Sequence, residues 1–416
     1  MTTKKILIVV DSIDVNDSSG SKANVSLILN LREVGFKLKV YHYSRKKIHL
    51  ENIKCVQIPE KKWSLLYFLS RSQRVLQRTF NINLAKFIEK IFGFSFTFFN
   101  DCNSILHSLE REKDFNPDWV LTLSKAASFR PHKAILKMPH WHSKWLAYIH
   151  DPYPMHSYPR PYDWVEPGHQ FKRDFFLKIV EKSKYLVYPS KLLAEWMGGY
   201  YKNQKGKEII IPHQIARQNV NDNLLPSYFN INNFNLFHAG NLMSTRNPIF
   251  LIKAFELFLE KNPKAKEHSH LIFVGNKSSF DNFIIEKQKK IPQLILSDGY
   301  VPFDTVITMQ HNASVNIILE ALGSISPFLP GKFPHCIQAK KTLLLLGPYY
   351  SECRRLLGKE YPYWSTIDNV NKIELHLTNI YLIWLKNRKN LILDRKDLID
   401  YLSGKYLLKI INDLTE

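Results

Sequence analysis

The chain carries, at residues 326–335, the stretch Ser-Pro-Phe-Leu-Pro-Gly-Lys-Phe-Pro-His, and the apolar run 342–346 follows it. Pro327, Pro330 and Gly331 interrupt regular structure, so we expect a non-repetitive turn here. Pro334 suits the first turn of a helix, because the N–H that proline lacks is not needed there. The other N–H groups of that turn attract anions, and Lys332 adds a full positive charge. The stretch therefore predicts an anion-binding loop before a short helix.

A second loop of the same kind lies upstream. The strand 236–239 is followed by a loop that begins with Gly240 and Asn241 and contains Arg246, and then by an apolar-periodic helix over 248–260. Two strand–loop–helix units, each with a basic residue near the helix start, would suit a diphosphate. Each motif alone is weak, since prolines and basic residues flank many ordinary helices. The alternative to an anion-binding role is, for Arg246, a solvated residue at a helix start and, for Lys332, an exposed lysine in a turn.

Outward from these loops, short apolar strands alternate with helical segments. The strands expected in the first half are 6–10, 38–43, 119–123, 145–149, 185–188 and 208–211. A helix over 23–34, capped by Gly35, joins the first two. Such strands, buried on both faces, predict a parallel sheet covered by helices on each side.

The alternation restarts after a polar stretch rich in Asn, Asp, Ser and Pro. The elements expected there are the strands 236–239, 271–274, 295–296, 315–319 and 342–346, the helices 248–260, 280–289 and 373–386, and a last segment 396–414. We therefore expect two doubly wound, Rossmann-like α/β domains facing across a cleft between the carboxyl ends of their strands. The expected bounds are 1–215, a linker 216–235, 236–390, and a C-terminal helical segment 391–416.

Composition agrees with a globular chain of two domains. The 416 residues are 45% hydrophobic and 23% charged, and no segment approaches the ~20 apolar residues of a membrane span. The N-terminal run 6–10 is too short for a signal-peptide core and reads as a buried strand. Four cysteines without paired spacing, Cys55, Cys102, Cys336 and Cys353, fit buried thiols in a reducing cytosol. We expect a cytoplasmic protein.

The net charge of +21 calls for an anionic partner. Three classes of partner would fit this charge: nucleic acid, an anionic membrane face and anionic substrates. No nucleic-acid reading module is evident in the sequence. Residues 63–100 interleave aromatic and aliphatic side chains with five basic ones: Arg71, Arg74, Arg78, Lys86 and Lys90. Such a stretch, with Trp63, Tyr67, Phe68 and Phe80, can lie on an anionic bilayer on the inner membrane face. It can equally form a core-packing helix pair with a solvated basic face.

Several short motifs occur in a fixed order along nearly the whole chain. They are Ser18-Ser19-Gly20, Tyr148-Ile149-His150-Asp151, Tyr188-Pro189-Ser190-Lys191, Ile211-Pro212-His213, and the run from His238 through Gly240, Asn241 and Leu242 to Arg246. In this order and spacing the chain resembles the GT-B glycosyltransferases, and more narrowly the retaining family 4 type.

The chain departs from that family at several positions. Asn241 stands where the family has an arginine, Arg246 where it has a lysine, and His213 where it has an asparagine. The family's two glutamates, eight positions apart, fall on Pro327 and His335. A proline-bearing loop replaces the first glutamate in one subgroup, and a histidine can still hydrogen-bond a hydroxyl.

The resemblance implies that the second domain binds a nucleotide-diphosphate sugar and the first binds the acceptor, a glycan or a lipid-linked sugar of cell-surface polysaccharide synthesis. It implies retention, with the leaving phosphate deprotonating the acceptor, and neither cofactor nor metal. The expected catalytic residues are His150, Arg246 and Lys332. The expected substrate contacts are Ser19, Gly20, Asp151, Ser190, Gly240, Asn241, Ser326, Phe328, Leu329, Gly331 and His335.

Rival hypotheses stay open. The same fold supports nucleotide-sugar epimerisation, which needs an acid/base pair, and the charge alone would suit a nucleic-acid-binding protein. His140 and His142 lack neighbouring acidic or thiol ligands for a metal. His150 as a buried structural histidine is the alternative to its catalytic role. The aromatic loop 153–164 beside it can contact a sugar or simply cover the domain edge.

Overall fold

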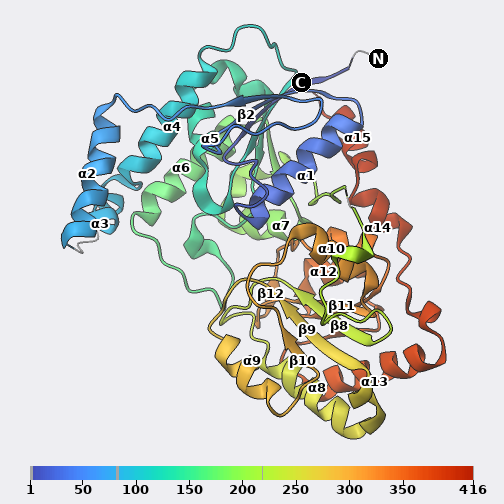
Figure 1. The fold of residues 1–416 in the computed structure, drawn as a ribbon. Helices are drawn as coiled ribbons and strands as arrows, with labels where there is room; N and C mark the ends of the chain where they lie inside the picture. The colour runs from blue at the N-terminus through green and yellow to red at the C-terminus, as the bar shows by residue number, and fades with distance from the viewer. Residues whose placement is uncertain (1–2, 81–83, 218, 416) are drawn as a thin grey trace. The chain divides into compact units, whose positions relative to one another are not determined.

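The computed structural model describes residues 3–80, 84–217 and 219–415 and divides into two compact units. The first unit comprises residues 1–158, 162–214 and 403–416, and the second comprises 159–161 and 215–402. Each unit is an α/β structure built on its own parallel sheet (Figure 1).

The first unit, in its described part, holds a seven-stranded parallel sheet in the order β3-β2-β1-β4-β5-β6-β7. Its strands are β1 (Lys5–Val10), β2 (Lys37–His42), β3 (Lys54–Gln57), β4 (Trp119–Leu123), β5 (Trp145–Tyr148), β6 (Tyr185–Tyr188) and β7 (Glu208–Ile210). The chain order reverses between β1 and β4, where Ile6 pairs with Trp119. This is the topological switch point of a doubly wound sheet.

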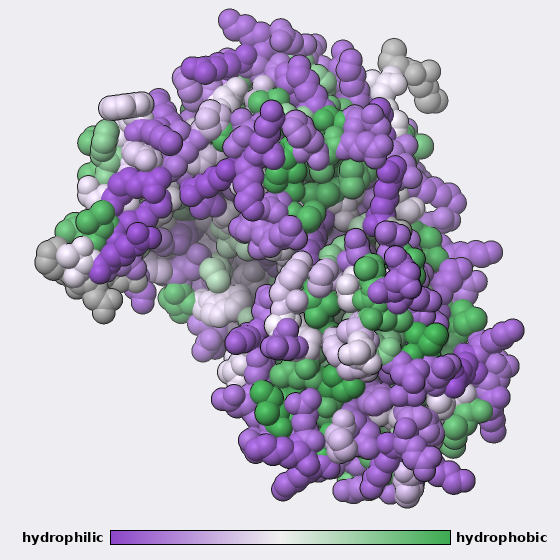
Figure 2. All heavy atoms as spheres, in the orientation of Figure 1, coloured by the Kyte–Doolittle hydropathy of each residue, from purple (hydrophilic) through white to green (hydrophobic). Residues whose placement is uncertain are grey.

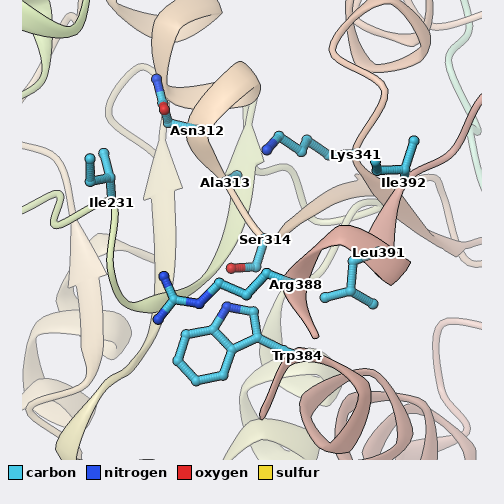
Figure 3. Close-up of a pocket in the computed structure, with 9 residues that line it drawn as sticks. All are labelled: Ile231, Asn312, Ala313, Ser314, Lys341, Trp384, Arg388, Leu391 and Ile392. Atoms are coloured by element: carbon cyan, nitrogen blue, oxygen red, sulfur yellow. The ribbon is translucent and has the colours of Figure 1, made fainter. Parts of the chain in front are cut away.

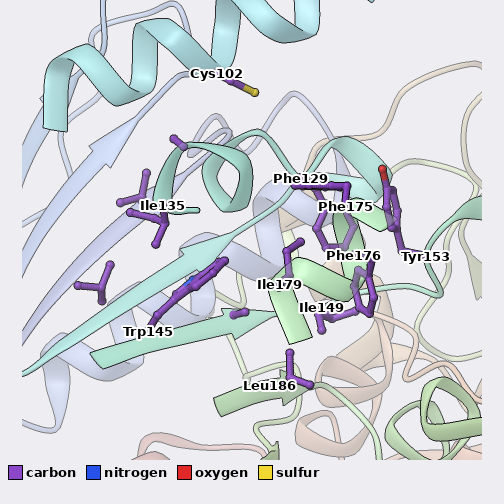
Figure 4. Packing of buried hydrophobic residues seen from close by; sticks show 14 of the residues in the cluster. Cys102, Phe129, Ile135, Trp145, Ile149, Tyr153, Phe175, Phe176, Ile179 and Leu186 are labelled. Carbon is purple, nitrogen blue, oxygen red and sulfur yellow. The ribbon is translucent and has the colours of Figure 1, made fainter. Parts of the chain in front are cut away.

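Helices cover both faces of this sheet. They are α1 (Ser19–Glu33), α4 (Phe96–Leu109), α5 (Arg130–Ile135), α6 (His169–Lys182) and α7 (Lys191–Tyr200). α1 ends as expected at Gly35, whose φ of +100° suits glycine and whose N–H donates to Arg32 O. On one face the rings of Trp145, Phe129 and Phe176 pack into a buried cluster (Figure 4). A second cluster, which includes Ile8 and Leu121, covers the other face, so the central strands are apolar on both sides.

Two further helices, α2 (Leu65–Phe80) and α3 (Leu84–Phe92), stand at the outer edge of the first unit (Figure 1). α2 packs against α4, and the Ser64 hydroxyl donates to Asn100 Oδ1 at 2.7 Å. α3 buries none of its described residues. The pair is therefore an attachment to the domain and not part of its core.

The second unit has, in its described part, a six-stranded parallel sheet in the order β10-β9-β8-β11-β13-β15. Its strands are β8 (Phe234–Ala239), β9 (Ser269–Val274), β10 (Leu294–Leu296), β11 (Val315–Leu319), β13 (Thr342–Leu346) and β15 (Trp364–Ser365). A separate two-stranded sheet pairs β12 (Ile325–Ser326) with β14 (Tyr350–Ser351). The helices are α8 (Ile249–Lys261), α9 (Asp281–Gln288), α10 (Phe303–Asn312), α11 (Phe333–Gln338), α12 (Glu352–Leu357), α13 (Val370–Lys386) and α14 (Lys396–Tyr401). The prediction of two doubly wound domains is confirmed.

The C-terminal segment, expected as one piece, is shared between the units. Leu398 and Leu402, in and just after α14, join the core of the second unit, whereas α15 (Gly404–Asn412) packs on α1 in the first. The Gly404 N–H donates to Asn30 Oδ1 at 3.1 Å. A Cβ at Gly404 would lie 2.5 Å from Val34 Cγ1, so glycine permits this close helix contact.

Cys102, Cys336 and Cys353 are buried and Cys55 is partly buried, all four as free thiols. Within the described ranges, no helix combines the length and the apolar character needed to cross a bilayer.

Candidate functional site

The switch point of the second sheet lies between β8 and β11, and the two loops singled out in the sequence leave the sheet there. The loop 240–248 follows β8, and the segment 320–332 follows β11. The Leu322 N–H donates to Thr245 O at 3.0 Å and ties the two segments together. The structure thus brings the predicted anion-binding elements of this domain to one edge.

Two glycines let the backbone approach closely at this edge. Gly240 has a φ of +150°, and a Cβ there would lie 2.6 Å from Lys332 Nζ. A Cβ at Gly275, after β9, would lie 2.6 Å from Gly240 O. Glycine at position 240 therefore leaves room for the end of the Lys332 side chain over the end of β8, and a Cβ there would push that flexible end aside.

Lys332 immediately precedes α11, and its Nζ lies 3.5 Å from His238 Nε2. His238 Nδ1 lies 3.1 Å from Ile317 O, and a carbonyl can only accept, so Nδ1 carries the proton and Nε2 turns a lone pair to Lys332. Desolvation, and then the nearby charge of Arg246, lower the pKa of Lys332 to about 7. This ammonium is poorly hydrated, beside a second cation, and suited to an anion.

Arg246 closes a turn with Met243, whose carbonyl accepts from the Arg246 N–H at 2.8 Å. Asn247 Oδ1 then accepts from the N–H of Ile249 at 2.8 Å, at the start of α8. Among the residues that the structure describes, no acidic side chain forms an ion pair with Arg246 or Lys332. Two cations without an ion pair to a carboxylate in the described structure therefore share the switch point.

Glu320 is a buried carboxyl that the sequence reasoning did not single out. It follows β11 directly, is 3% exposed, and its Oε1 accepts from Ser326 Oγ at 2.9 Å. Burial raises its pKa to about 7, opposed by hydrogen bonds from Ser351 and Ser326 and by the charge of Arg246. An acidic residue directly after a buried strand is the signal that could have found it.

The remaining predicted residues of this domain take different places. Ser326 is buried against Glu320, and Leu329 belongs to an apolar core cluster. Asn241 is exposed, and its Oδ1 accepts from Asn276 N at 3.4 Å. The remaining three are the partly exposed Phe328, the exposed Gly331, and His335, whose ring is 5.4 Å from Phe303 in an edge-to-face contact.

The switch point of the first sheet carries a different set of charges. Asp11, directly after β1, accepts from Lys125 N at 3.1 Å and from the Ser128 hydroxyl, and lies 3.6 Å from Arg130. Burial raises the pKa of Asp11, while Arg130 opposes that shift. Arg130 also pairs with Asp101 at 2.9 Å. The cations here already have protein partners.

Ser19 and Gly20 form the first turn of α1 beside this edge. The N-cap is Ser18, whose Oγ accepts from Ser21 N at 3.1 Å. A Cβ at Gly20 would meet only ordinary contacts at 3.8 Å. Glycine is therefore not required by packing at this position.

His150, two residues after the end of β5, is buried, and neither of its ring nitrogens has a hydrogen-bond partner in the described structure. Its ring stacks on His213 at 5.7 Å and 8°, and lies 4.5 Å from Tyr148. Burial, and then His213, hold the pKa of His150 well below its usual value. A neutral imidazole with two unused nitrogens suits a hydroxyl-bearing ligand. The neighbouring predicted residue Asp151 hydrogen-bonds Tyr158.

Ser190 follows β6 and is fully buried. Its Oγ accepts from Leu193 N at 2.9 Å, so it caps α7. This contact gives Ser190 a structural role whatever it binds.

One pocket of the second unit lies away from this site (Figure 3). Asn312, Ala313 and Ser314 line it just before β11, and Lys341 just before β13, at the amino ends of the strands. Trp384 and Arg388 close it. The pocket is therefore at the edge opposite the switch-point loops.

No cluster of three or more His, Cys, Asp and Glu suited to a metal occurs among residues 3–80, 84–217 and 219–415. The expectation of metal-independent chemistry stays a prediction.

Comparison with known proteins identifies the architecture. No protein-family model matches the chain, and no curated protein matches its sequence. Solved structures do. A glycosyltransferase from Rickettsia africae is 14% identical with a TM-score of 0.62, covering 99% of this chain and 98% of the other. The fold is GT-B.

Two further structures have the same fold. An α,α-trehalose-phosphate synthase (UDP-forming) from Burkholderia xenovorans, in complex with glucose-6-phosphate, is 10% identical with a TM-score of 0.63 over 98% of this chain and 99% of its own. A trehalose-6-phosphate protein from E. coli bound with UDP-2-fluoro glucose is 12% identical with a TM-score of 0.61 over 99% and 100%. At these identities the likeness establishes the fold and leaves the activity to be argued from the site.

Proposed function

We propose that the chain is a glycosyltransferase that moves a sugar from a nucleotide-diphosphate sugar to a glycan or lipid-linked acceptor. The observation that carries the proposal is the pair Lys332 and Arg246 at the switch point of the second sheet, two cations without a carboxylate partner in the described structure. Dinucleotides and nucleotide sugars bind at such points in doubly wound folds. The similar structures named above, one UDP-forming and one bound with a UDP-sugar analogue, support this choice of donor.

The chemistry follows from the leaving group. As the bond between the anomeric carbon and the diphosphate oxygen breaks, negative charge develops on the diphosphate, and fixed cations stabilise it. Arg246 offers a forked set of donors to phosphate oxygens, and Lys332 a point charge. The acceptor hydroxyl forms the new bond on the same face and gives its proton to the leaving phosphate, so the configuration is retained and no enzymic base is needed.

His150 is proposed to hydrogen-bond a hydroxyl of the transferred sugar. Its two unpartnered ring nitrogens, in a buried site of the acceptor domain, support this role. Burying them without a partner costs free energy that a ligand hydroxyl would recover.

The product is proposed to belong to cell-surface polysaccharide synthesis, and the enzyme to work in the cytoplasm. Peripheral attachment to the inner membrane face would place it beside lipid-linked acceptors. The basic excess of the chain supports such an attachment.

The test is a thermal-shift screen with UDP, GDP, ADP and TDP, followed by turnover assays with sugars of the nucleotide that binds. A ligand that binds only the native state raises Tm, so one diphosphate should stabilise the protein. Lys253→Met, an exposed lysine on α8, is the matched control for Lys332→Met. If no nucleoside diphosphate stabilises the wild type, the proposal is wrong.

A further inference from the structure

The helices α2 and α3 expose large apolar side chains at the edge of the first unit. Trp63 is 87% exposed, and along α2 the exposed fractions are 75% for Leu65, 53% for Phe68 and 61% for Val75. On α3, Phe87, Ile91 and Phe92 are also exposed. Figure 2 shows apolar and hydrophilic side chains mixed on this outer pair of helices. The two helices are in contact with each other, and we call their exposed side chains together the α2–α3 face.

The α2 helix divides into three stripes. Ser70 and Gln73 are buried on the side that packs on α4. At 100° per residue, the exposed Leu65, Phe68, Val75 and Leu76 fall within an arc of about 100°. Arg71, Arg74 and Arg78, at i, i+3 and i+7, lie next to that arc. The apolar stripe therefore has a basic border.

The short α3 helix repeats the arrangement. Phe87 and Ile91, at i and i+4, share one face, and Lys86 and Lys90 directly precede them. Glu89, the acidic residue of this helix, pairs with Lys172 of α6 at 3.1 Å. Glu89 thus forms its ion pair with α6 and not with the basic side chains of α3.

These exposures count against the alternative of a core-packing helix pair with a solvated basic face. α2 packs on α4 by one side only, and α3 buries no described residue. Residues 81–83 and the side chain of Phe80, part of the predicted stretch, lie outside the described residues.

We propose that the α2–α3 face docks on an anionic lipid bilayer. Its apolar side chains would enter the headgroup–acyl boundary, while Arg78, Lys86 and Lys90 reach lipid phosphates. Charge favours a bilayer over a second copy of the chain as the partner, because two α2–α3 faces in contact would bring like charges together. The inference concerns a surface of the first unit and holds whether or not the chain transfers sugar.

The first experiment measures flotation of the whole chain with vesicles of phosphatidylcholine alone or mixed with phosphatidylglycerol. The wild type should float only with the anionic vesicles, and less as salt rises, because exposed charges are screened. Trp63→Ser/Phe68→Ser/Val75→Ser should lower the bound fraction about tenfold, since the apolar area that enters the bilayer is lost. Leu375→Ser/Leu382→Ser/Leu385→Ser, on similarly exposed positions of α13, should bind like the wild type.

The second experiment removes charge. Arg78→Glu/Lys86→Glu/Lys90→Glu suits this better than changes at Arg71 and Arg74. Arg71 pairs with Glu60 at 3.1 Å, and Arg74 contacts Thr97 at 3.5 Å, so changing them would disturb the packing. The triple variant should lose anionic selectivity and keep its nucleotide-induced Tm shift.

Three outcomes would overturn the proposal. One is no vesicle binding by the wild type, and another is equal binding by the wild type and both α2–α3 variants. The third is a dimer in light scattering that the Trp63→Ser/Phe68→Ser/Val75→Ser variant dissociates, without any vesicle binding. Loss of nucleotide binding with intact flotation would count against the glycosyltransferase proposal alone.

Discussion

The two parallel sheets carry opposite electrostatics at the same topological position. At the switch point of the first sheet, Arg130 is held by Asp11 and Asp101, and Lys125 by Asp17 at 2.6 Å. At that of the second, Lys332 and Arg246 have no carboxylate partner among the described residues. The first edge pairs its cations with carboxylates, whereas the cations of the second edge form no such ion pair and have Glu320, whose pKa burial raises to about 7, as a nearby carboxyl. The difference supports the proposal that the anionic diphosphate binds to the second unit and a hydroxyl-bearing acceptor to the first.

The largest expected effect comes from removing the desolvated cation. Lys332→Met should lower turnover of the nucleotide sugar by about 10²–10³-fold, because a fixed charge that stabilises the leaving group is lost. Steady-state kinetics measures this, with Lys253→Met on the surface of α8 as the control. Equal losses of turnover in Lys332→Met and Lys253→Met would contradict the assignment of the anion site to the second switch point.

Arg246→Ala should weaken nucleoside-diphosphate binding by roughly 1.5–3 kcal/mol, the range for hydrogen bonds to charged groups. Isothermal titration measures it. If the wild type and the variant bind the diphosphate equally, Arg246 is a solvated helix-start residue and does not belong to the binding site.

Diphosphate affinity should fall by up to about tenfold per pH unit above pH 7. The pKa of Lys332 is lowered to about 7, so raising the pH removes the ammonium. The pKa of Glu320 is raised to about 7, so the same rise creates a carboxylate nearby, and both changes weaken anion binding. Titration at pH 7 and pH 9 should show a smaller drop for Glu320→Gln and for Lys332→Met. An identical profile in all three proteins would assign the titration to other groups.

His150→Ala should lower turnover by about threefold to tenfold, the worth of one neutral hydrogen bond, and leave diphosphate affinity almost unchanged. The reason is that His150 belongs to the first unit, whereas the cations belong to the second. The measurement is the ratio of the loss in turnover to the loss in diphosphate affinity. Parallel losses would mean that the substitution disturbs the fold, and a lower Tm would identify that case.

The sequence predicted the sheets well because their strands are short and buried on both faces. The expected bounds of β4, β6, β11 and β13 agree with the structure, since each is an apolar run between polar breaks. β3 was missed because Lys54–Gln57, at the sheet edge, has only two partly buried apolar residues, Cys55 and Val56, between an exposed lysine and an exposed glutamine. The short strands β12, β14 and β15 depend on tertiary pairing and have no periodicity of their own.

The candidate site was predictable in part. Gly240 and Lys332 belong to recognisable loops, but their close approach is long-range and no local pattern contains it. Glu320 was missed because the family resemblance drew attention to Pro327 and His335. The neutralised edge of the first sheet could not be foreseen, since Asp11, Asp101 and Arg130 are far apart in sequence and only the fold pairs them.

The most direct test is calorimetric titration of the stabilising nucleoside diphosphate into the wild type, Lys332→Met and Asp11→Asn. Asp11→Asn removes a buried charge from the first switch point with little change of shape. The account predicts that affinity falls about tenfold or more in Lys332→Met, as for a lost charged hydrogen bond, and stays within about twofold of wild type in Asp11→Asn. Undiminished binding by Lys332→Met, or a loss confined to Asp11→Asn, would contradict it.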